Sequence, residues 1–400
     1  MANQTISSNR TAGLPAWFWI VVPAVALVAL VAVFAVTNPA AVFVSSAPPV
    51  EDLALERIAV VPEGFVVTVF NNGPTENTVA QVLVDDAYWD FTIEPSATLP
   101  RLGRATVKIP YAWVPGEPHT IMLLTTTGTP FEGEIAAATL TPTPGLREVG
   151  AYALLGIYVG VIPVVLGMLW FPAMKRLGRR GLGAILALTV GLLVFLLIDT
   201  LLEAFVLAAQ APSVFQGVPL ALFAAVLTWL ALMAISTRRG PAQTDPAKQR
   251  LYIATLIALG IGLHNLGEGL AIGAAFALGE AALGSFLVIG FTLHNVTEGV
   301  GIAAPVTRDQ PSWRQFLALA LLAGLPAVVG AWIGGFAFSP IMATLFLGIG
   351  VGAIWQVIVE VGNLLRRDAA KDGTPVVSWL NVGALLAGFG IMYLTAFLVK

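Results

Sequence analysis

Two apolar segments of the chain contain the same short word, in which histidine and asparagine precede a glutamate and a glycine. The words are His264-Asn265-Leu266-Gly267-Glu268-Gly269 and His294-Asn295-Val296-Thr297-Glu298-Gly299. Histidine and glutamate are four positions apart, so a helix places them on one face, and the asparagine flanks that face. The chain has only 3 histidines. Two of them in the same word therefore indicate a shared chemical role.

The two words predict a site for a divalent metal ion. A short connection makes the two helices antiparallel neighbours, so both words lie at a similar depth and their side chains can converge. Imidazole nitrogen and carboxylate oxygen without thiolate favour zinc, followed by iron(II), manganese, cobalt, nickel and cadmium. The expected ligands are His264, Asn265, Glu268, His294, Asn295 and Glu298. The glycines after each glutamate are expected to allow close helix packing.

The composition places these helices in a membrane. Hydrophobic residues make up 57% of the chain and charged residues 11%, far from the profile of a soluble domain. The net charge of -3 gives no basic face for nucleic acid. The absence of cysteine excludes disulfide scaffolds, thiolate nucleophiles and cysteine-ligated metals.

Apolar stretches long enough to cross about 30 Å of hydrocarbon predict the elements that position the two words. They lie near 17–37, 149–171, 182–208, 218–236, 251–278, 283–305, 315–336, 340–365 and 376–399. We expect residues 1–37 to form a tail and an uncleaved transmembrane anchor, rather than a signal peptide. An insert over 38–148 follows, and then an all-α, polytopic, eight-helix core over 149–400.

Basic residues in alternate loops predict the orientation of the core. These residues are Lys175, Arg176, Arg179, Arg180, Arg238, Arg239, Lys248, Arg250, Arg308, Arg314, Arg366, Arg367 and Lys371. The intervening loops contain no lysine or arginine. We therefore expect a cytoplasmic N-terminus and an extracytoplasmic insert and C-terminus. The expected location, a bacterial-type inner (plasma) membrane, depends on the resemblance described below.

The sequence of the insert predicts a small β-sandwich. Short runs rich in valine, threonine, isoleucine and aromatic residues alternate with turn signals, as in such folds. The runs cover 65–70, 79–84, 88–93, 105–109 and 119–125. A copper site at His119 and Met122 is disfavoured because the insert has neither a cysteine nor a second histidine. His119 is interpreted as a surface or core residue.

Further carboxylates fall inside the core spans, where charge is costly and usually marks a pathway or site. Asp199 and Glu203 lie in the second core span, and Glu360 lies in the seventh, one helical turn after the amide side chain of Gln356. No lysine or arginine lies within the core spans to neutralise them. A proton or a bound cation can do so, and we expect these four residues to line a route for positive charge.

Paired HNxxEG words on the fourth and fifth of eight core helices resemble the ZIP (Zrt/Irt-like) family of divalent metal transporters, and most nearly its bacterial members. The resemblance covers 146–400 and is strongest over 260–305. The resemblance implies that the metal moves into the cytoplasm. It also implies that core helices 1–3 and 6–8 are inverted repeats of each other, arranged around core helices 4 and 5. The family commonly has a two-metal centre. By position, His264, Glu268, His294 and Glu298 would hold the transported ion, while Asn265 and Asn295, with both glutamates as bridges, would build the second position.

Other segments match the family less fully. Residues 197–204 resemble FLHLLPEA with Asp199 in place of histidine and Leu202 in place of proline, and residues 357–360 resemble its VVxE stretch. Ala327 stands where family members commonly place a glutamate in core helix 6. We therefore expect the second metal position to be weak or empty, with a single transported ion. The β insert is an addition to the usual core.

The expected function is transport of a divalent metal ion, with zinc first and iron(II), manganese and cadmium as alternatives. A non-transporting membrane metal sensor and an intramembrane metal-dependent hydrolase are the other hypotheses, although the chain lacks the HExxH motif. No enzyme activity and no prosthetic group are expected, since Zn²⁺ or a related cation is the substrate. The expected partners are the metal ion and the lipid bilayer, not nucleic acid. A homodimer is left open, and the residues do not identify a ligand for the β domain.

Overall fold

The structure is a computed structural model that describes residues 16–37, 50–238 and 245–397. The chain divides into two compact units, Met1–Val50 and Glu51–Lys400. The first contributes helix α1 (Ala16–Thr37) at the position of the predicted anchor. The helix is 22 residues long, and the anchor stays a prediction. The tail before residue 16, the start of the insert (38–49) and Arg239 lie outside the described residues.

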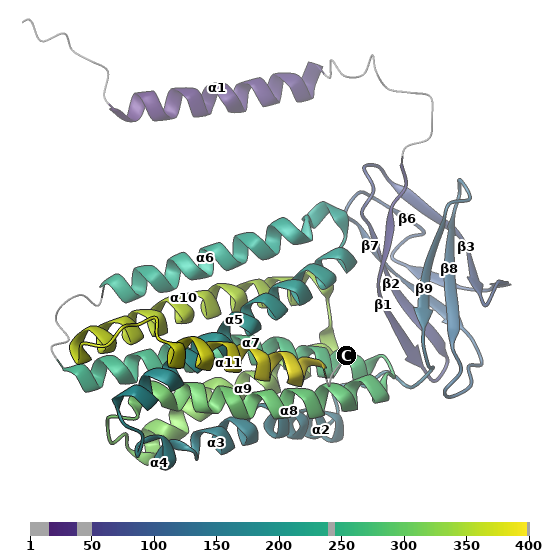
Figure 1. Cartoon of the computed structure of the whole chain (residues 1–400). Helices are drawn as coiled ribbons and strands as arrows, with labels where there is room; N and C mark the ends of the chain where they lie inside the picture. Colours follow the sequence, from purple (N-terminus) through teal and green to yellow (C-terminus); the bar gives the residue numbers. More distant parts are fainter. Residues whose placement is uncertain (1–15, 38–49, 239–244, 398–400) are drawn as a thin grey trace, which may run out of the picture. The chain divides into compact units, whose positions relative to one another are not determined.

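Eight helical segments among the described residues are long and apolar enough to cross a membrane, which confirms the predicted core spans. Figure 1 shows the helices of this core packed beside one another. They are Leu146–Met174, Arg179–Gln210, Ser213–Ser236, Pro246–Ala277, Ala281–Val306, Trp313–Ala337, Pro340–Lys371 and Trp379–Phe397.

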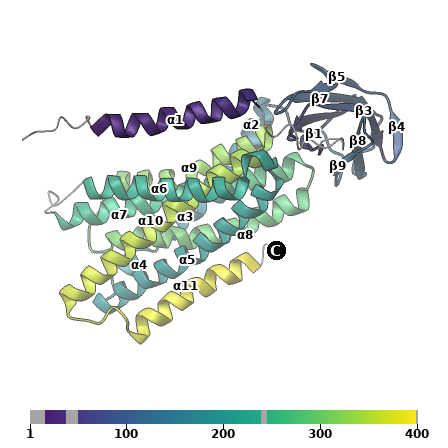
Figure 2. The ribbon, with the colours of Figure 1, turned by 90° about the horizontal axis from the view of Figure 1, so that it is seen from above.

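The first of these spans is composite, and it is made of α2 (Leu146–Gly156), the π-helical turn η2 (Ile157–Val161), α3 (Ile162–Met168) and α4 (Phe171–Met174). The remaining elements are α5 (Arg179–Gln210), η3 (Ser213–Phe215), α6 (Gly217–Arg238), α7 (Pro246–Ala277), α8 (Ala281–Ala303), η4 (Ala304–Val306), α9 (Trp313–Ala337), α10 (Pro340–Asp372) and α11 (Trp379–Phe397). Figure 2 shows α11 running beside α5.

The glycine that ends each word lies at a close helix crossing. A Cβ atom at Gly269 of α7 would lie 2.0 Å from the carbonyl oxygen of Ala327 on α9. A Cβ atom at Gly299 of α8 would lie 2.2 Å from the carbonyl oxygen of Val164 on α3. Only glycine permits such an approach of backbone to backbone. The predicted packing role of these glycines is confirmed, and it fixes how closely α9 and α3 cover the two words.

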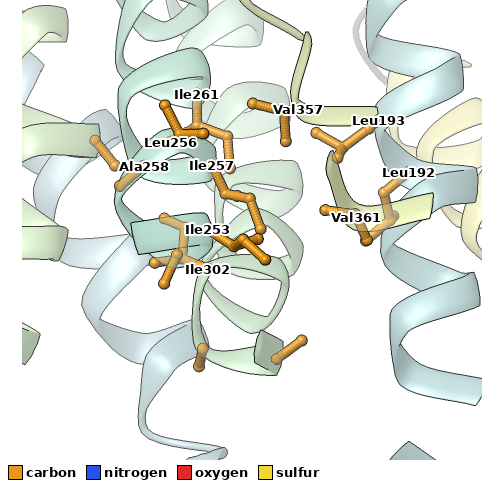
Figure 3. Close-up of a cluster of buried hydrophobic side chains, with 14 of the residues drawn as sticks. Leu192, Leu193, Ile253, Leu256, Ile257, Ala258, Ile261, Ile302, Val357 and Val361 are labelled. Atoms are coloured by element: carbon orange, nitrogen blue, oxygen red, sulfur yellow. The ribbon is translucent and has the colours of Figure 1, made fainter. Parts of the chain in front are cut away.

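A cluster of buried apolar side chains fills the bundle between the two words and the ends of the helices that carry the basic loops. Figure 3 shows its members, which include Leu192, Leu193, Ile253, Ile257, Ile261, Ile302, Val357 and Val361. On α7 these residues precede His264, and on α8 Ile302 follows Glu298. The cluster therefore closes the bundle on the side of the two words that faces the basic loops.

The insert is a sandwich of two antiparallel sheets, with strand orders β1-β2-β7-β5 and β4-β3-β8-β9. The strands are β1 (Leu53–Val61), β2 (Gly64–Asn71), β3 (Asn77–Val84), β4 (Ala87–Trp89), β5 (Thr92–Glu94), β6 (Thr98–Leu99), β7 (Arg104–Pro110), β8 (His119–Thr125) and β9 (Pro130–Ile135). Apolar residues from both sheets form one core, as the alternation predicts.

The predicted single strand over 88–93 is wrong in detail. The chain leaves one sheet after β4, turns at Asp90 and Phe91, and enters the other sheet as β5. The sequence pattern also missed β1 and β9. Both are edge strands, and each carries charged residues that blur the apolar alternation, as edges commonly do.

The sandwich contacts the ends of the helices that lack basic loops. The Asn72 side chain donates to the Ser213 hydroxyl at 2.7 Å and accepts from the Val214 amide at 2.9 Å. The Arg57 guanidinium donates to the Phe336 carbonyl at 2.8 Å. That carbonyl belongs to the last turn of α9, where helical carbonyls have no partner within the helix. The insert therefore caps one helix end and holds the turn before α6.

Candidate metal centre

Three side chains of the two words converge in the buried centre of the bundle. His264, Glu268 and His294 each offer one ligand atom, and these atoms all lie within 4.8 Å of one another. The Nε2 atom of His264 lies 3.1 Å from Glu268 Oε1, and the Nε2 atom of His294 contacts the same oxygen. The three side chains are at most 7% exposed. Two imidazoles around one carboxylate oxygen form a donor set suited to zinc and related ions.

The second oxygen of Glu268 is held by the other word. The Asn295 amide donates to Glu268 Oε2 at 2.9 Å and to the Val159 carbonyl at 3.1 Å. Val159 lies in the π-helical turn η2, where the altered backbone hydrogen bonding leaves carbonyl groups free to accept from side chains. Such turns are frequent at functional sites. Asn295 therefore orients the carboxylate and ties it to the first core span.

Thr200 of α5 orients the first histidine, and the sequence patterns did not identify it. Its hydroxyl lies 2.9 Å from His264 Nδ1 and donates to the Leu196 carbonyl at 2.7 Å. A hydroxyl has one hydrogen, so its oxygen is left to accept from an Nδ1–H group. Nε2 of His264 then carries a lone pair that faces the Glu268 oxygen. Two hydrogen-bond acceptors that face each other need a cation or a proton between them. In metal sites, the ring nitrogen of a histidine that does not bind the metal commonly donates to a partner, as Nδ1 of His264 does here.

Glu298 lies outside this group of three. Both of its carboxylate oxygens are buried and have no hydrogen-bond partner among the described residues, and the same holds for the amide oxygens of Asn265 and Asn295. The amide nitrogen of Asn265 donates to the Ala323 carbonyl at 3.0 Å. Glu298 lines a cavity of about 10 Å³ together with Ile261, which has about the volume that one water needs. These buried acceptors need a cation, a proton or water.

The four residues predicted to line a route divide into two groups. On α5, Asp199 lines a cleft of about 280 Å³ against Tyr393 of α11, and Glu203 lies half-buried one turn further along. On α10, Gln356 donates to Glu360 at 3.0 Å, and Ser236 of α6 donates to the same oxygen at 2.6 Å. None of the four belongs to the cluster of three ligands among the residues that the structure describes.

Ala327 is buried where helices cross closely. A Cβ atom at Gly160 would lie 2.8 Å from the Cβ atom of Ala327, and the Ala327 carbonyl packs against Gly269. A glutamate side chain would have to displace η2 or α7. The packing therefore gives a physical reason for the small residue at this position.

His119 is a core residue of the sandwich. It is 6% exposed and its Nδ1 atom lies 2.8 Å from Asp85 Oδ2. Along β8, His119 is buried while Met122 is half-buried on the opposite face, so the two do not converge. Burial would raise the pKa of Asp85, but hydrogen bonds from His119, the Thr120 amide and Tyr111 together hold it below its ordinary value.

Comparison with known proteins identifies one family. Residues 233–396, from the end of α6 to α11, match the family model described as ZIP zinc transporter. No curated protein matches the chain. The matched region contains both words and the three converging ligands.

Proposed function

We propose that this chain, whose residues 233–396 match the family model described as ZIP zinc transporter, belongs to that family and moves divalent metal ions, zinc first, across the membrane towards the cytoplasm. The observation that carries the proposal is the convergence of His264, Glu268 and His294 in a buried, eight-helix bundle. Nitrogen and oxygen donors without thiolate suit zinc, iron(II), manganese and cadmium, so the substrate is a divalent ion of this class.

We assign the ion to the three converging ligands, with Asn295 and Thr200 as the groups that orient them. The amide of Asn295 fixes one oxygen of Glu268, and the hydroxyl of Thr200 fixes the His264 tautomer. Glu298 would be the next ligand on the way out, because its oxygens lack hydrogen-bond partners among the described residues and the residue lines a small cavity together with members of the apolar cluster. Asp199, Glu203, Gln356 and Glu360 would be further steps along the route.

The direction rests on the distribution of charge and on the position of the apolar cluster. Lysine and arginine occur in every second loop of the core, which by the positive-inside rule places those loops in the cytoplasm. The cluster around Ile257 and Val361 lies between the ligands and those loops. Release into the cytoplasm therefore requires that α5, α7 and α10 separate, as in transporters that expose one site alternately to each side.

The glycine crossings support the inverted repeat. Gly269 of α7 packs on α9, the sixth core helix, whereas Gly299 of α8 packs on α3, in the first core helix. A Cβ atom at Gly191 of α5 would lie 2.0 Å from the carbonyl oxygen of Leu385 on α11, and one at Gly352 of α10 would lie 2.1 Å from the carbonyl oxygen of Ala225 on α6. An inverted repeat exchanges core helices 1, 2 and 3 with 6, 7 and 8, and helix 4 with helix 5. This exchange turns the crossing of helices 4 and 6 into that of helices 5 and 1, and the crossing of helices 2 and 8 into that of helices 7 and 3. The predicted arrangement accounts for both pairs.

Uptake into proteoliposomes tests the proposal, with zinc, manganese, iron(II) and cadmium each supplied outside. Glu268→Gln removes the central carboxylate charge and should weaken uptake at least about 100-fold, since even outer partners of metal ligands contribute about 10- to 100-fold. Glu280→Gln is the matched control, because it makes the same change at the turn between α7 and α8.

Saturable uptake by Glu280→Gln and its loss in Glu268→Gln would support transport. Equal uptake by both variants would refute the assigned site. Tight metal binding without uptake by the unaltered protein would instead support the sensor hypothesis.

A further inference from the structure

An apolar groove lies between the first core span and α9, and none of the metal ligands lines it. It has a volume of about 480 Å³ and is formed by α3, α4, the loop before α9 and the first two turns of α9. Every residue of its lining is apolar, including Met168, Phe171, Trp313, Phe316 and Leu317. Trp313 is 70% exposed and Leu317 is 44% exposed, so the protein leaves the groove open. Because both walls belong to candidate membrane spans, the acyl chain of a lipid suits this lining.

Two cations lie at the rim of the groove, each over an aromatic ring of its lining. The ammonium nitrogen of Lys175 lies 5.3 Å from the centre of the Phe171 ring, and the guanidinium carbon of Arg314 lies 5.7 Å from the centre of the Trp313 ring. Such contacts hold a cation beside an apolar surface while its charge stays in contact with water. The Phe171 and Phe316 rings meet edge to face at 4.8 Å, so the two walls of the groove contact each other.

The charge at this rim is positive. Neither Lys175 nor Arg314 forms an ion pair with an acidic residue in the parts of the chain that the structure describes. The acid nearest to Arg314 in sequence is Asp309, which accepts hydrogen bonds of 2.8 and 2.5 Å from Arg250. Both cations belong to the basic segments that the positive-inside rule assigns to the cytoplasm, where the membrane leaflet is anionic.

The rim rather than the lining gives the groove its preference. Lipid chains in the bilayer are as apolar as the groove, so the lining provides shape but little selectivity. Each lysine or arginine near an anionic membrane surface contributes about fivefold in affinity. A second copy of this chain bound by twofold symmetry would bring the same positive rim against itself. We infer that the groove binds an anionic phospholipid, with an acyl chain along the lining and the headgroup held by Lys175 and Arg314.

Thermal unfolding of the full-length protein in neutral detergent tests the site, with dioleoyl phosphatidylglycerol, dioleoyl phosphatidylcholine and inorganic phosphate as probes. The two lipids have the same chains and differ in headgroup charge, and phosphatidylglycerol should bind more tightly. Lys175→Gln/Arg314→Gln should weaken the apparent Kd for phosphatidylglycerol about 25-fold, the product of two fivefold contributions, and should leave phosphatidylcholine binding unchanged. Arg366→Gln/Arg367→Gln is the matched control, because it removes two exposed cations of α10 that do not line the groove.

Inorganic phosphate should cause no comparable shift, because it has no chain to occupy the groove. A preference for phosphatidylglycerol that is lost in Lys175→Gln/Arg314→Gln and kept in the control would support the site. Equal shifts with the two lipids, equal losses in the two double variants, or a shift with phosphate as large as that with phosphatidylglycerol would overturn it. Light scattering that shows a lipid-free dimer, and its dissociation in Leu317→Gln, would place a second copy in the groove and would also overturn it.

Discussion

Replacing Thr200 by valine should weaken zinc binding by about 10- to 100-fold, the range found for groups that orient metal ligands. The side chain is 0% exposed, and its oxygen lies 2.9 Å from His264 Nδ1. Valine has a similar shape but cannot accept a hydrogen bond. The buried Nδ1–H group would then lack a partner, at a cost of about 1–3 kcal/mol, which corresponds to about 5- to 150-fold in affinity.

Thr189→Val is the matched control on the same helix. Thr189 is also buried, and its hydroxyl donates to the carbonyl four residues earlier, Ile185, at 2.9 Å, as Thr200 donates to Leu196. Both substitutions therefore remove one hydroxyl and one hydrogen bond within α5. Only Thr200→Val also removes the contact with His264, so the difference between the two variants isolates that contact.

Competition with a chelator of known affinity would measure the zinc Kd of both purified variants, and thermal unfolding would confirm that both are folded. We expect Thr189→Val to bind as the unaltered protein does. Equal affinity in the two variants would show that the Thr200 hydroxyl does not orient the ligand, and would refute the assignment of the His264 tautomer.

Three further outcomes are expected. Gly269→Ala places a methyl group 2.0 Å from the Ala327 carbonyl oxygen, and thermal unfolding should show that it destabilises the bundle by about 3 kcal/mol or more. Gly362→Ala, at a position with open space around it, is the control and should be neutral or stabilising by up to about 1 kcal/mol. The lowered pKa of Asp85 stabilises the sandwich above the unfolded pKa of about 3.9, and this stabilisation is lost as pH falls through the lower folded value. Asp85→Asn should therefore flatten the acid dependence of β8 hydrogen-exchange protection, measured after incubation at each pH, and an unchanged dependence would contradict the role of its hydrogen bonds. Elemental analysis of the zinc-loaded protein should give one ion per chain, because Ala327 supplies no carboxylate, and two tightly bound ions would disprove this.

The core spans, the β-sandwich and the two words could be predicted from the order of the residues. A span is set by the length of an apolar stretch against the thickness of the bilayer, which is a property of consecutive residues. The spacing of His264 and Glu268 likewise follows from helix periodicity. Inner strands such as β8 were predictable because buried and half-buried residues alternate along them, so their apolar residues recur at every second position. Edge strands such as β1 were not, because their exposed side tolerates charge.

Which of the donor atoms lie close together depends on how the helices pack in three dimensions. Both words carry a glutamate at the same spacing, yet Glu268 contacts both histidines while Glu298 faces a small cavity. That difference depends on the depth and rotation of two helices, which the crossings at Gly269 and Gly299 set through contacts distant in sequence. The role of Thr200 could not be predicted either. A threonine in an apolar helix has no distinctive sequence pattern, and its role depends on the contact with a histidine from another helix.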